Sequence, residues 1–145
     1  MTTILELAQE IQRGEAPASP IGRLLGFALK GIEPGRAVFE MDADERHHNP
    51  MGTLHGGIYC DLADAAMGYA YAATLSERET FTTVELKINF LRPVRCGKLT
   101  AEAKVVKAGG TLGYIECDVK DHAGKLVARA ASTCMKLRQD RPSSM

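Results

Sequence analysis

The segment at residues 48–64, HNPMGTLHGGIYCDLAD, combines glycine, histidine and aspartate at the start of a predicted helix. Gly56 and Gly57 fall where the first N–H groups of a helix have no internal acceptor. Because these residues have no side chain, a ligand carbonyl could approach the free amides, and the helix dipole would stabilise negative charge on its oxygen. This geometry predicts an oxyanion hole. A tight loop-to-helix turn would require the same glycines, so the pattern leaves both interpretations open.

Two carboxylates follow on one helical stripe, because Asp61 and Asp64 are three residues apart. Asp61 lies early in the helix, where an aspartate commonly complements the helix dipole and stays solvated. Asp64 lies deeper, among small apolar residues, and an unpaired carboxylate there would be costly unless it faced a polar pocket. We therefore expect Asp64, rather than Asp61, to act as a general base or nucleophile.

The distance between these groups decides which copies of the chain can form one site. Eight residues separate Gly56 from Asp64, which corresponds to roughly 12 Å along a helix that rises about 1.5 Å per residue. An oxygen bound at the Gly56 amide is therefore out of reach of Asp64 on the same helix. If both groups act on one substrate, the aspartate must come from a second copy, so we predict an active site between two antiparallel helices of a homodimer.

Local sequence patterns predict the elements that position this segment. Thr3 and Glu6 match a capping box ahead of a short amphipathic helix. Pro34-Gly35 is a common turn and predicts a hairpin between the β-biased runs on either side. The long alanine-rich run predicts a slim helix that can lie close to a sheet. In chain order we expect a helix and linker within residues 1–20 (the linker at 14–20), β runs at 24–33 and 36–43, a helix at 57–75, strands at 83–91, 98–107, 111–120 and 125–137, and a disordered tail at 138–145.

The second half of the chain changes to a period of two. Within residues 83–91, Val84, Leu86, Ile88 and Phe90 fall on one face, which is typical of a half-buried strand. The joints after this strand are short and rich in turn-forming residues, so we expect consecutive strands to be antiparallel neighbours. One long helix with about six strands predicts a single α+β domain in which a curved antiparallel sheet wraps around the helix. The exposed sheet edges would favour edge-to-edge dimerisation.

Composition excludes several classes of function. Eighteen basic and eighteen acidic side chains cancel in 145 residues, and without a charged run there is no electrostatic footprint for nucleic acid or anionic lipid. The N-terminus lacks the features of a signal peptide, and no apolar run approaches the roughly 20 residues needed to span a bilayer. We expect a cytoplasmic protein with no membrane contact. The four cysteines form no C-x-x-C pair, and the histidines and acids at 42–48 fit no zinc spacing, so neither a metal nor another cofactor is expected.

The motif N-x-x-G-x-x-H-G-G-x-x-x-x-L-A-D runs from Asn49 to Asp64. Together with TVELKINFLRPVRCG, which follows it, the motif resembles the hotdog-fold acyl-CoA thioesterases, in particular the phenylacetate-pathway type, over residues 22–137. The hotdog fold is the helix-wrapped antiparallel sheet predicted above. The resemblance implies a thioester hydrolase that needs no metal and binds acyl-CoA as a homodimer. A homotetramer, formed as a dimer of dimers, and a dimer alone both stay open.

The resemblance also implies a role for each motif residue. The Gly56 amide would polarise the thioester carbonyl, with Asn49 as a second polar contact. Asp64 of the partner subunit would activate the hydrolytic water or attack the carbonyl directly, and Thr83 would help to position water. His55 would orient the loop and the substrate, although a purely structural histidine is an equal alternative. Contacts to coenzyme A are implied for Gly57, Glu85, Phe90, Lys107, Gly109, Gly110 and Thr111.

Other features leave alternatives open. Relatives have small or uncharged residues at the position of Asp61, so this second carboxylate is a departure and would repel Asp64. A pocket lined by Met51, Leu54 and Tyr59 would suit an arylacetyl, a benzoyl or a medium-chain acyl group alike. The alternative functions are a non-catalytic acyl-CoA-binding hotdog protein and a hotdog hydratase or dehydratase.

Overall fold

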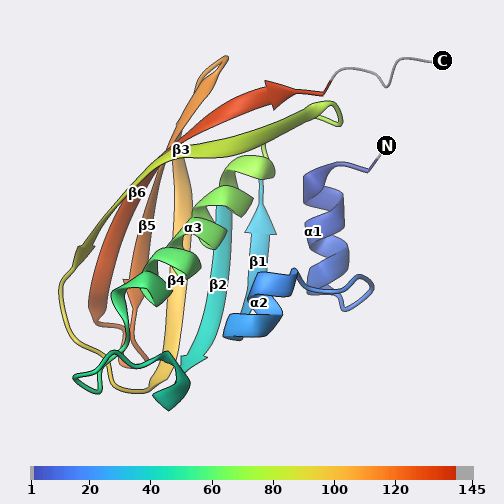
Figure 1. The fold of residues 1–145 in the computed structure, drawn as a ribbon. Coiled ribbons are helices and arrows are strands. Elements are labelled where there is room, and N and C mark those ends of the chain that lie inside the picture. Colours follow the sequence, from blue (N-terminus) through green and yellow to red (C-terminus); the bar gives the residue numbers. More distant parts are fainter. Residues whose placement is uncertain (1, 140–145) are drawn as a thin grey trace.

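The computed structural model describes residues 2–139 and contains one antiparallel sheet that curves around a long helix (Figure 1). The central helix is α3, while two shorter helices, α1 and α2, lie beside β1. This arrangement confirms the predicted α+β fold. No helix within residues 2–139 is both long and apolar enough to cross a bilayer. The elements are α1 (Ile4–Gln12), α2 (Pro20–Leu25), β1 (Phe27–Glu33), β2 (Arg36–Ala43), the 3₁₀ turn η1 (Glu45–His47), α3 (Gly56–Ala72), β3 (Glu79–Phe90), β4 (Gly97–Ala108), β5 (Leu112–Lys120) and β6 (Leu126–Arg138).

The order of strands differs from the prediction at one place. Across the sheet the order is β1-β2-β4-β5-β6-β3, so β1–β2, β4–β5 and β5–β6 are antiparallel neighbours as expected. The expectation that β3 would neighbour β4 is wrong, because β4 pairs with β2 and β3 pairs with β6. Residues 91–96 therefore form no hairpin. They pass the start of α3, where the Leu54 N–H donates to the Val94 carbonyl (2.7 Å), and β1 and β3 are left as the sheet edges.

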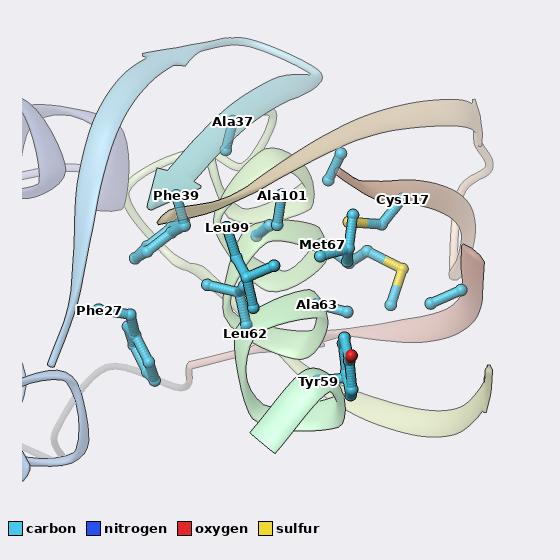
Figure 2. Packing of buried hydrophobic residues seen from close by; sticks show 14 of the residues in the cluster. Phe27, Ala37, Phe39, Tyr59, Leu62, Ala63, Met67, Leu99, Ala101 and Cys117 are labelled. Carbon is cyan, nitrogen blue, oxygen red and sulfur yellow. The ribbon is translucent and has the colours of Figure 1, made fainter. Parts of the chain in front are cut away.

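Small residues let α3 lie close to the sheet. Ala63, Ala66 and Ala70 on the helix are completely buried, and so are Ala101 and Ala103 on β4. Without bulky side chains at these positions, the helix and the sheet can approach closely, as the alanine-rich sequence predicted. The larger side chains that fill the remaining space include Leu62, Met67, Leu99 and Phe39 (Figure 2).

A bulge in β3 changes which side chains face the helix. The pairing of β3 with β6 shifts register between Thr83 and Glu85, so Val84 is an extra residue, and its side chain is 59% exposed. Leu86 and Ile88 pack against the core as predicted, but the prediction for Val84 is wrong, and Thr83 turns toward α3 instead. An extra residue in one strand reverses the alternation of side chains on its two sides. The alternation predicted from the sequence therefore holds only for the residues that follow the bulge.

The N-terminal segment contains a helix that sequence analysis missed. The predicted capping box is confirmed, since the Glu6 N–H donates to Thr3 Oγ1 (3.1 Å) and the Thr3 N–H donates to Glu6 Oε2 (2.7 Å). The predicted linker ends at α2, which begins at Pro20 with Ser19 as its N-cap. Serine followed by proline is a favourable helix start. The first residues of the run predicted as a strand at 24–33 are therefore helical.

The C-terminal strand extends into the segment predicted to be a disordered tail. β6 continues through Arg138, the first residue of that segment. The Gln139 N–H donates to the Arg78 carbonyl (2.8 Å), which prolongs the pairing with the chain before β3. The rest of the predicted tail, residues 140–145, lies outside the described residues.

Candidate active site

Asn49 organises the loop that leads into α3. Its Oδ1 accepts hydrogen bonds from the N–H groups of Met51 (3.0 Å) and Thr53 (3.2 Å), and its Nδ2 donates to Thr53 Oγ1 (3.0 Å). Both ends of the side-chain amide are thus used inside the loop, in the manner of an Asx turn. The contact between Asn49 and a substrate remains a prediction. Thr53 was not a candidate, and no sequence signal singles it out.

His47 and His55 tie this loop to the rest of the chain. His47 is buried, and because its Nδ1 accepts from the Asp44 N–H (3.1 Å), its Nε2 donates to the Leu25 carbonyl (2.9 Å). The His55 N–H donates to the His47 carbonyl (2.9 Å). The exposed His55 ring covers Gly57, where an added Cβ would meet Nε2 at 3.1 Å. Within residues 2–139, no three His, Cys, Asp or Glu side chains are arranged to hold a metal ion.

The first N–H groups of α3 are free, and Gly56 opens into a cavity. Among the residues that the structure describes, the N–H groups of Gly56 and Gly57 have no acceptor, as expected at a helix start. Gly56 lines a cavity of about 350 Å³, and an added Cβ would lie 3.1 Å from Phe90 Cζ. Free amides at the positive end of a helix dipole suit a developing oxyanion. The cavity is lined by Asn49, Thr53, Leu54, Gly56, Tyr59, Phe90, Leu91, Arg92 and Pro93.

Asp64 and Thr83 lie in a second cavity. Thr83 Oγ1 donates to Asp64 Oδ1 (3.1 Å), a contact made possible by the bulge at Val84, which turns Thr83 toward α3. The half-buried carboxylate lines a cavity of about 300 Å³. The hydroxyl therefore orients the carboxylate in a partly polar pocket. The cavity is lined by Ser19, Ile21, Phe27, Asp61, Asp64, Ala65, Gly68, Tyr69, Phe81 and Thr83.

The two cavities have no lining residue in common. Gly56 belongs to the first, with Asn49, and Asp64 belongs to the second, with Thr83. One chain therefore does not bring the candidate amides and the candidate carboxylate together, in line with their separation of roughly 12 Å along the helix. A site that uses both groups needs a second copy of the chain.

Burial changes the acidity of two neighbours of Asp64 on α3. The pKa of Asp61 is raised, first by burial and then by the charge of Asp64, while His55 opposes this shift. Burial also raises the pKa of the Cys60 thiol, and the two carboxylates add to the increase. A thiol with a raised pKa stays protonated at neutral pH and is a poor nucleophile. The half-buried Cys60 is therefore a poor candidate for the nucleophile of this site.

The residues implied for coenzyme A divide into two groups. The first group is Gly57, at the start of α3, and Phe90, the last residue of β3, whose ring lies beside Gly56. Glu85 and Lys107 are exposed on the outer face of the sheet, on one rung that runs from Lys107 through Tyr114 and Thr133 to Glu85. The remaining residues, Gly109, Gly110 and Thr111, form the turn between β4 and β5. Glu85 and Lys107 thus lie on the outer face of the sheet, away from the Gly56 cavity, whose lining includes neither of them.

The apolar walls of the Asp64 cavity were not predicted. They come from separate elements, with Ile21 from α2, Phe27 from β1 and Phe81 from β3. An added Cβ at Gly68 would lie 3.1 Å from Phe81 Cζ, so glycine lets this ring rest against α3. Only the Ser-Pro helix start could have located any of these residues from the sequence. Of the predicted acyl-pocket residues, Leu54 and Tyr59 line the Gly56 cavity, whereas Met51 is 76% exposed and lines neither.

Known proteins share this sequence pattern and this fold. A family model described as the thioesterase superfamily matches residues 51–128, more than half of the chain. Acyl-coenzyme A thioesterase 13 of Homo sapiens is 31% identical over 136 residues, which cover 92% of this chain and 96% of that protein. A thioesterase crystal structure from Haemophilus influenzae has a TM-score of 0.83 at 25% identity and covers 99% of this chain and 96% of that one. The E. coli PaaI protein from the phenylacetic acid degradation operon has a TM-score of 0.82 at 24% identity over 94% of this chain and 98% of that one, which shows the same fold.

Proposed function

The chain belongs to the thioesterase superfamily and is a thioester hydrolase, and from this we propose that it hydrolyses acyl-CoA esters of small aryl or medium-chain acids. The observation that carries the proposal is the Thr83–Asp64 hydrogen bond (3.1 Å) inside a cavity with apolar walls. Acyl-CoA as the substrate class is supported by the name of the human relative. At about 300 Å³, the cavity is at the small end of ligand sites, which favours a compact acyl group.

In the proposed reaction, two copies of the chain act on one thioester. The Gly56 amide of one copy donates a hydrogen bond to the carbonyl oxygen, and Asp64 of the other copy takes a proton from a water that attacks the carbonyl carbon. The C–S bond of the tetrahedral intermediate then breaks, and the coenzyme A thiolate leaves and takes up the proton. In the alternative route, Asp64 attacks the carbon itself and water hydrolyses the resulting anhydride.

A thioester suits these groups for a chemical reason. A thiolate is a stable leaving group, since a thiol has a pKa of about 8.5, so hydrolysis requires little help from a strong general acid. The carbonyl oxygen, by contrast, gains full negative charge and needs donors held in place. Free helix amides would supply these donors, and one oriented carboxylate would activate the attacking water.

The edge strand β3 supports a dimer that would complete such a site. β3 has 12 residues and pairs on only one side, so it exposes a row of N–H and C=O groups. Joining two sheets edge to edge through β3 would pair these groups around a two-fold axis. The two α3 helices would then run antiparallel, with Gly56 of each opposite Asp64 of the other. A homodimer is thus part of the proposed function.

Replacing Thr83 by valine is expected to lower kcat/KM for acyl-CoA hydrolysis roughly tenfold. Valine keeps the branched shape but removes the hydroxyl that orients Asp64, so the carboxylate loses its fixed direction. Thr83→Ser restores the hydroxyl and should retain most of the activity. Steady-state assays with thermal melts of both variants test this expectation, which fails if valine and serine behave alike.

The proposed function is tested with a panel of acyl-CoA esters and a thiol-trapping dye. Arylacetyl, benzoyl and straight-chain esters of increasing length are each incubated with the protein, and thiol release is followed by absorbance. We expect steady release with at least one small aryl or medium-chain ester. Binding without thiol release would instead indicate a non-catalytic acyl-CoA-binding protein, and a change in enoyl absorbance would indicate a hydratase or dehydratase.

A further inference from the structure

The cavity that holds Asp64 contains a second carboxylate and no basic side chain. Asp61 is one helical turn before Asp64, and both line the cavity, Asp61 as an exposed residue and Asp64 as a half-buried one. Its other walls are apolar or uncharged, with Ile21, Phe27 and Phe81 as the large apolar ones. No lysine, arginine or histidine is among the lining residues. An anionic group that entered this space would find two like charges and no counter-charge among the lining residues, while the nearest basic group to act on Asp61 is His55, outside the lining.

Asp61 and Asp64 are close enough to influence each other. Residues three apart on a helix have Cβ atoms about 5–6 Å apart. Consistent with this, the charge of Asp64 contributes to the raised pKa of Asp61, after burial. Asp64 is hydrogen-bonded to Thr83, whereas Asp61 accepts no hydrogen bond from a side chain within residues 2–139. The hydrogen bond between Thr83 and Asp64 therefore forms without any contribution from Asp61.

We propose that Asp61 is a specificity-determining residue that discriminates against acyl groups carrying a second carboxylate, so that the enzyme hydrolyses neutral monoacyl thioesters in preference to dicarboxylic ones. This inference rests on the proposed function, because it assumes that the acyl group occupies the Asp64 cavity. The far carboxylate of a short dicarboxylic ester lies only a few bonds from the reacting carbonyl. It therefore enters the space shared by both aspartates and the apolar walls, where it is desolvated and repelled.

The size of the effect follows from Coulomb's law. Two like charges about 6 Å apart, in an effective dielectric of about 40, repel each other enough to change a rate roughly tenfold. Removing the charge of Asp61 removes its repulsion of the substrate's far carboxylate, whereas the repulsion by Asp64 remains. Repulsion between partly exposed charges is also screened by salt, so the discrimination has an ionic-strength dependence that a purely steric selection lacks.

The test compares glutaryl-CoA with hexanoyl-CoA, which have similar length and differ by one negative charge. For the wild type we expect a clear preference for hexanoyl-CoA in kcat/KM. In Asp61→Asn and in the smaller Asp61→Ser, this preference should fall roughly tenfold. Asp61→Glu keeps the charge and should keep the preference. Using a ratio of two substrates removes any effect of these variants on the overall rate or on the fraction of folded protein.

Each outcome bears on the proposal. Raising the salt concentration should narrow the wild-type preference and should affect Asp61→Asn less. Hydrolysis of both esters with the same ratio in the wild type and in Asp61→Asn would overturn the specificity role while leaving the proposed function intact. Release of thiol from no ester of the acyl-CoA panel would overturn the proposed function, and the specificity role with it.

Discussion

Replacing Asp64 by asparagine is expected to lower kcat/KM for acyl-CoA hydrolysis about thousandfold. Asparagine keeps the shape of the side chain, and its oxygen can still accept the Thr83 hydroxyl, which lies 3.1 Å from Asp64 Oδ1 in the wild type. It cannot take a proton from water or attack a carbonyl at neutral pH. The loss should therefore appear in kcat, with little change in the melting temperature. Thiol-release assays and thermal melts of the same preparation separate the two effects.

A mixture of two inactive variants tests which copy supplies Asp64. In Gly56→Val, the added side chain would press on Phe90, whose Cζ is 3.1 Å from the position of a Cβ, and would obstruct the amide. In a dimer formed from Gly56→Val and Asp64→Asn, one of the two shared sites has both native residues. Co-expression with different tags is expected to restore about a quarter of the wild-type activity, since half of randomly formed dimers are mixed. If each site lay within one chain, the mixture would stay inactive.

Gly113→Ala is expected to destabilise the protein by about 3 kcal/mol, which corresponds to a fall of roughly 10 °C in Tm for a domain of this size. An added Cβ would collide with Tyr71 Cε2 and would lie 2.8 Å from its Cδ2. The Tyr71 ring is completely buried and packs edge-on against Phe81, with ring centroids 5.8 Å apart. The ring cannot move without disturbing the core and the wall of the Asp64 cavity, to which Phe81 belongs.

Gly31→Ala is the matched control for this prediction. Gly31 also lies in a strand, β1, but the nearest atom to an added Cβ is Val38 Cβ at 3.9 Å, which is an ordinary contact. Alanine there should leave the free energy of unfolding within about 0.5 kcal/mol of the wild type, or raise it slightly. Denaturant unfolding of both variants provides the comparison. Equal stability of the two would show that the core around Tyr71 can relax, contrary to our expectation.

Local chemistry made most of the fold predictable. The Thr3–Glu6 capping box, the Pro34-Gly35 turn and the alanine-rich helix each depend on residues that are close in the sequence. The Ser19-Pro20 helix start is equally local, but it lies in the segment whose composition predicts a linker. The pairing of β3 with β6 was not predictable in this way, because the short connection after β3 does not show which strand pairs with β3 in the sheet.

The sequence by itself determined the separation of Gly56 from Asp64, because the rise of a helix per residue is fixed. It also placed the free amides at the start of α3. Only the tertiary structure decided that Thr83 faces Asp64, since the bulge at Val84 arises from the pairing of β3 with β6 and reverses the alternation read from the sequence. The tertiary structure alone also brought both aspartates to one cavity, with the half-buried Asp64 and the exposed Asp61 lining it beside residues of α2, β1 and β3. Distances within one helix follow from its geometry, whereas the walls of a cavity depend on contacts between residues far apart in the chain.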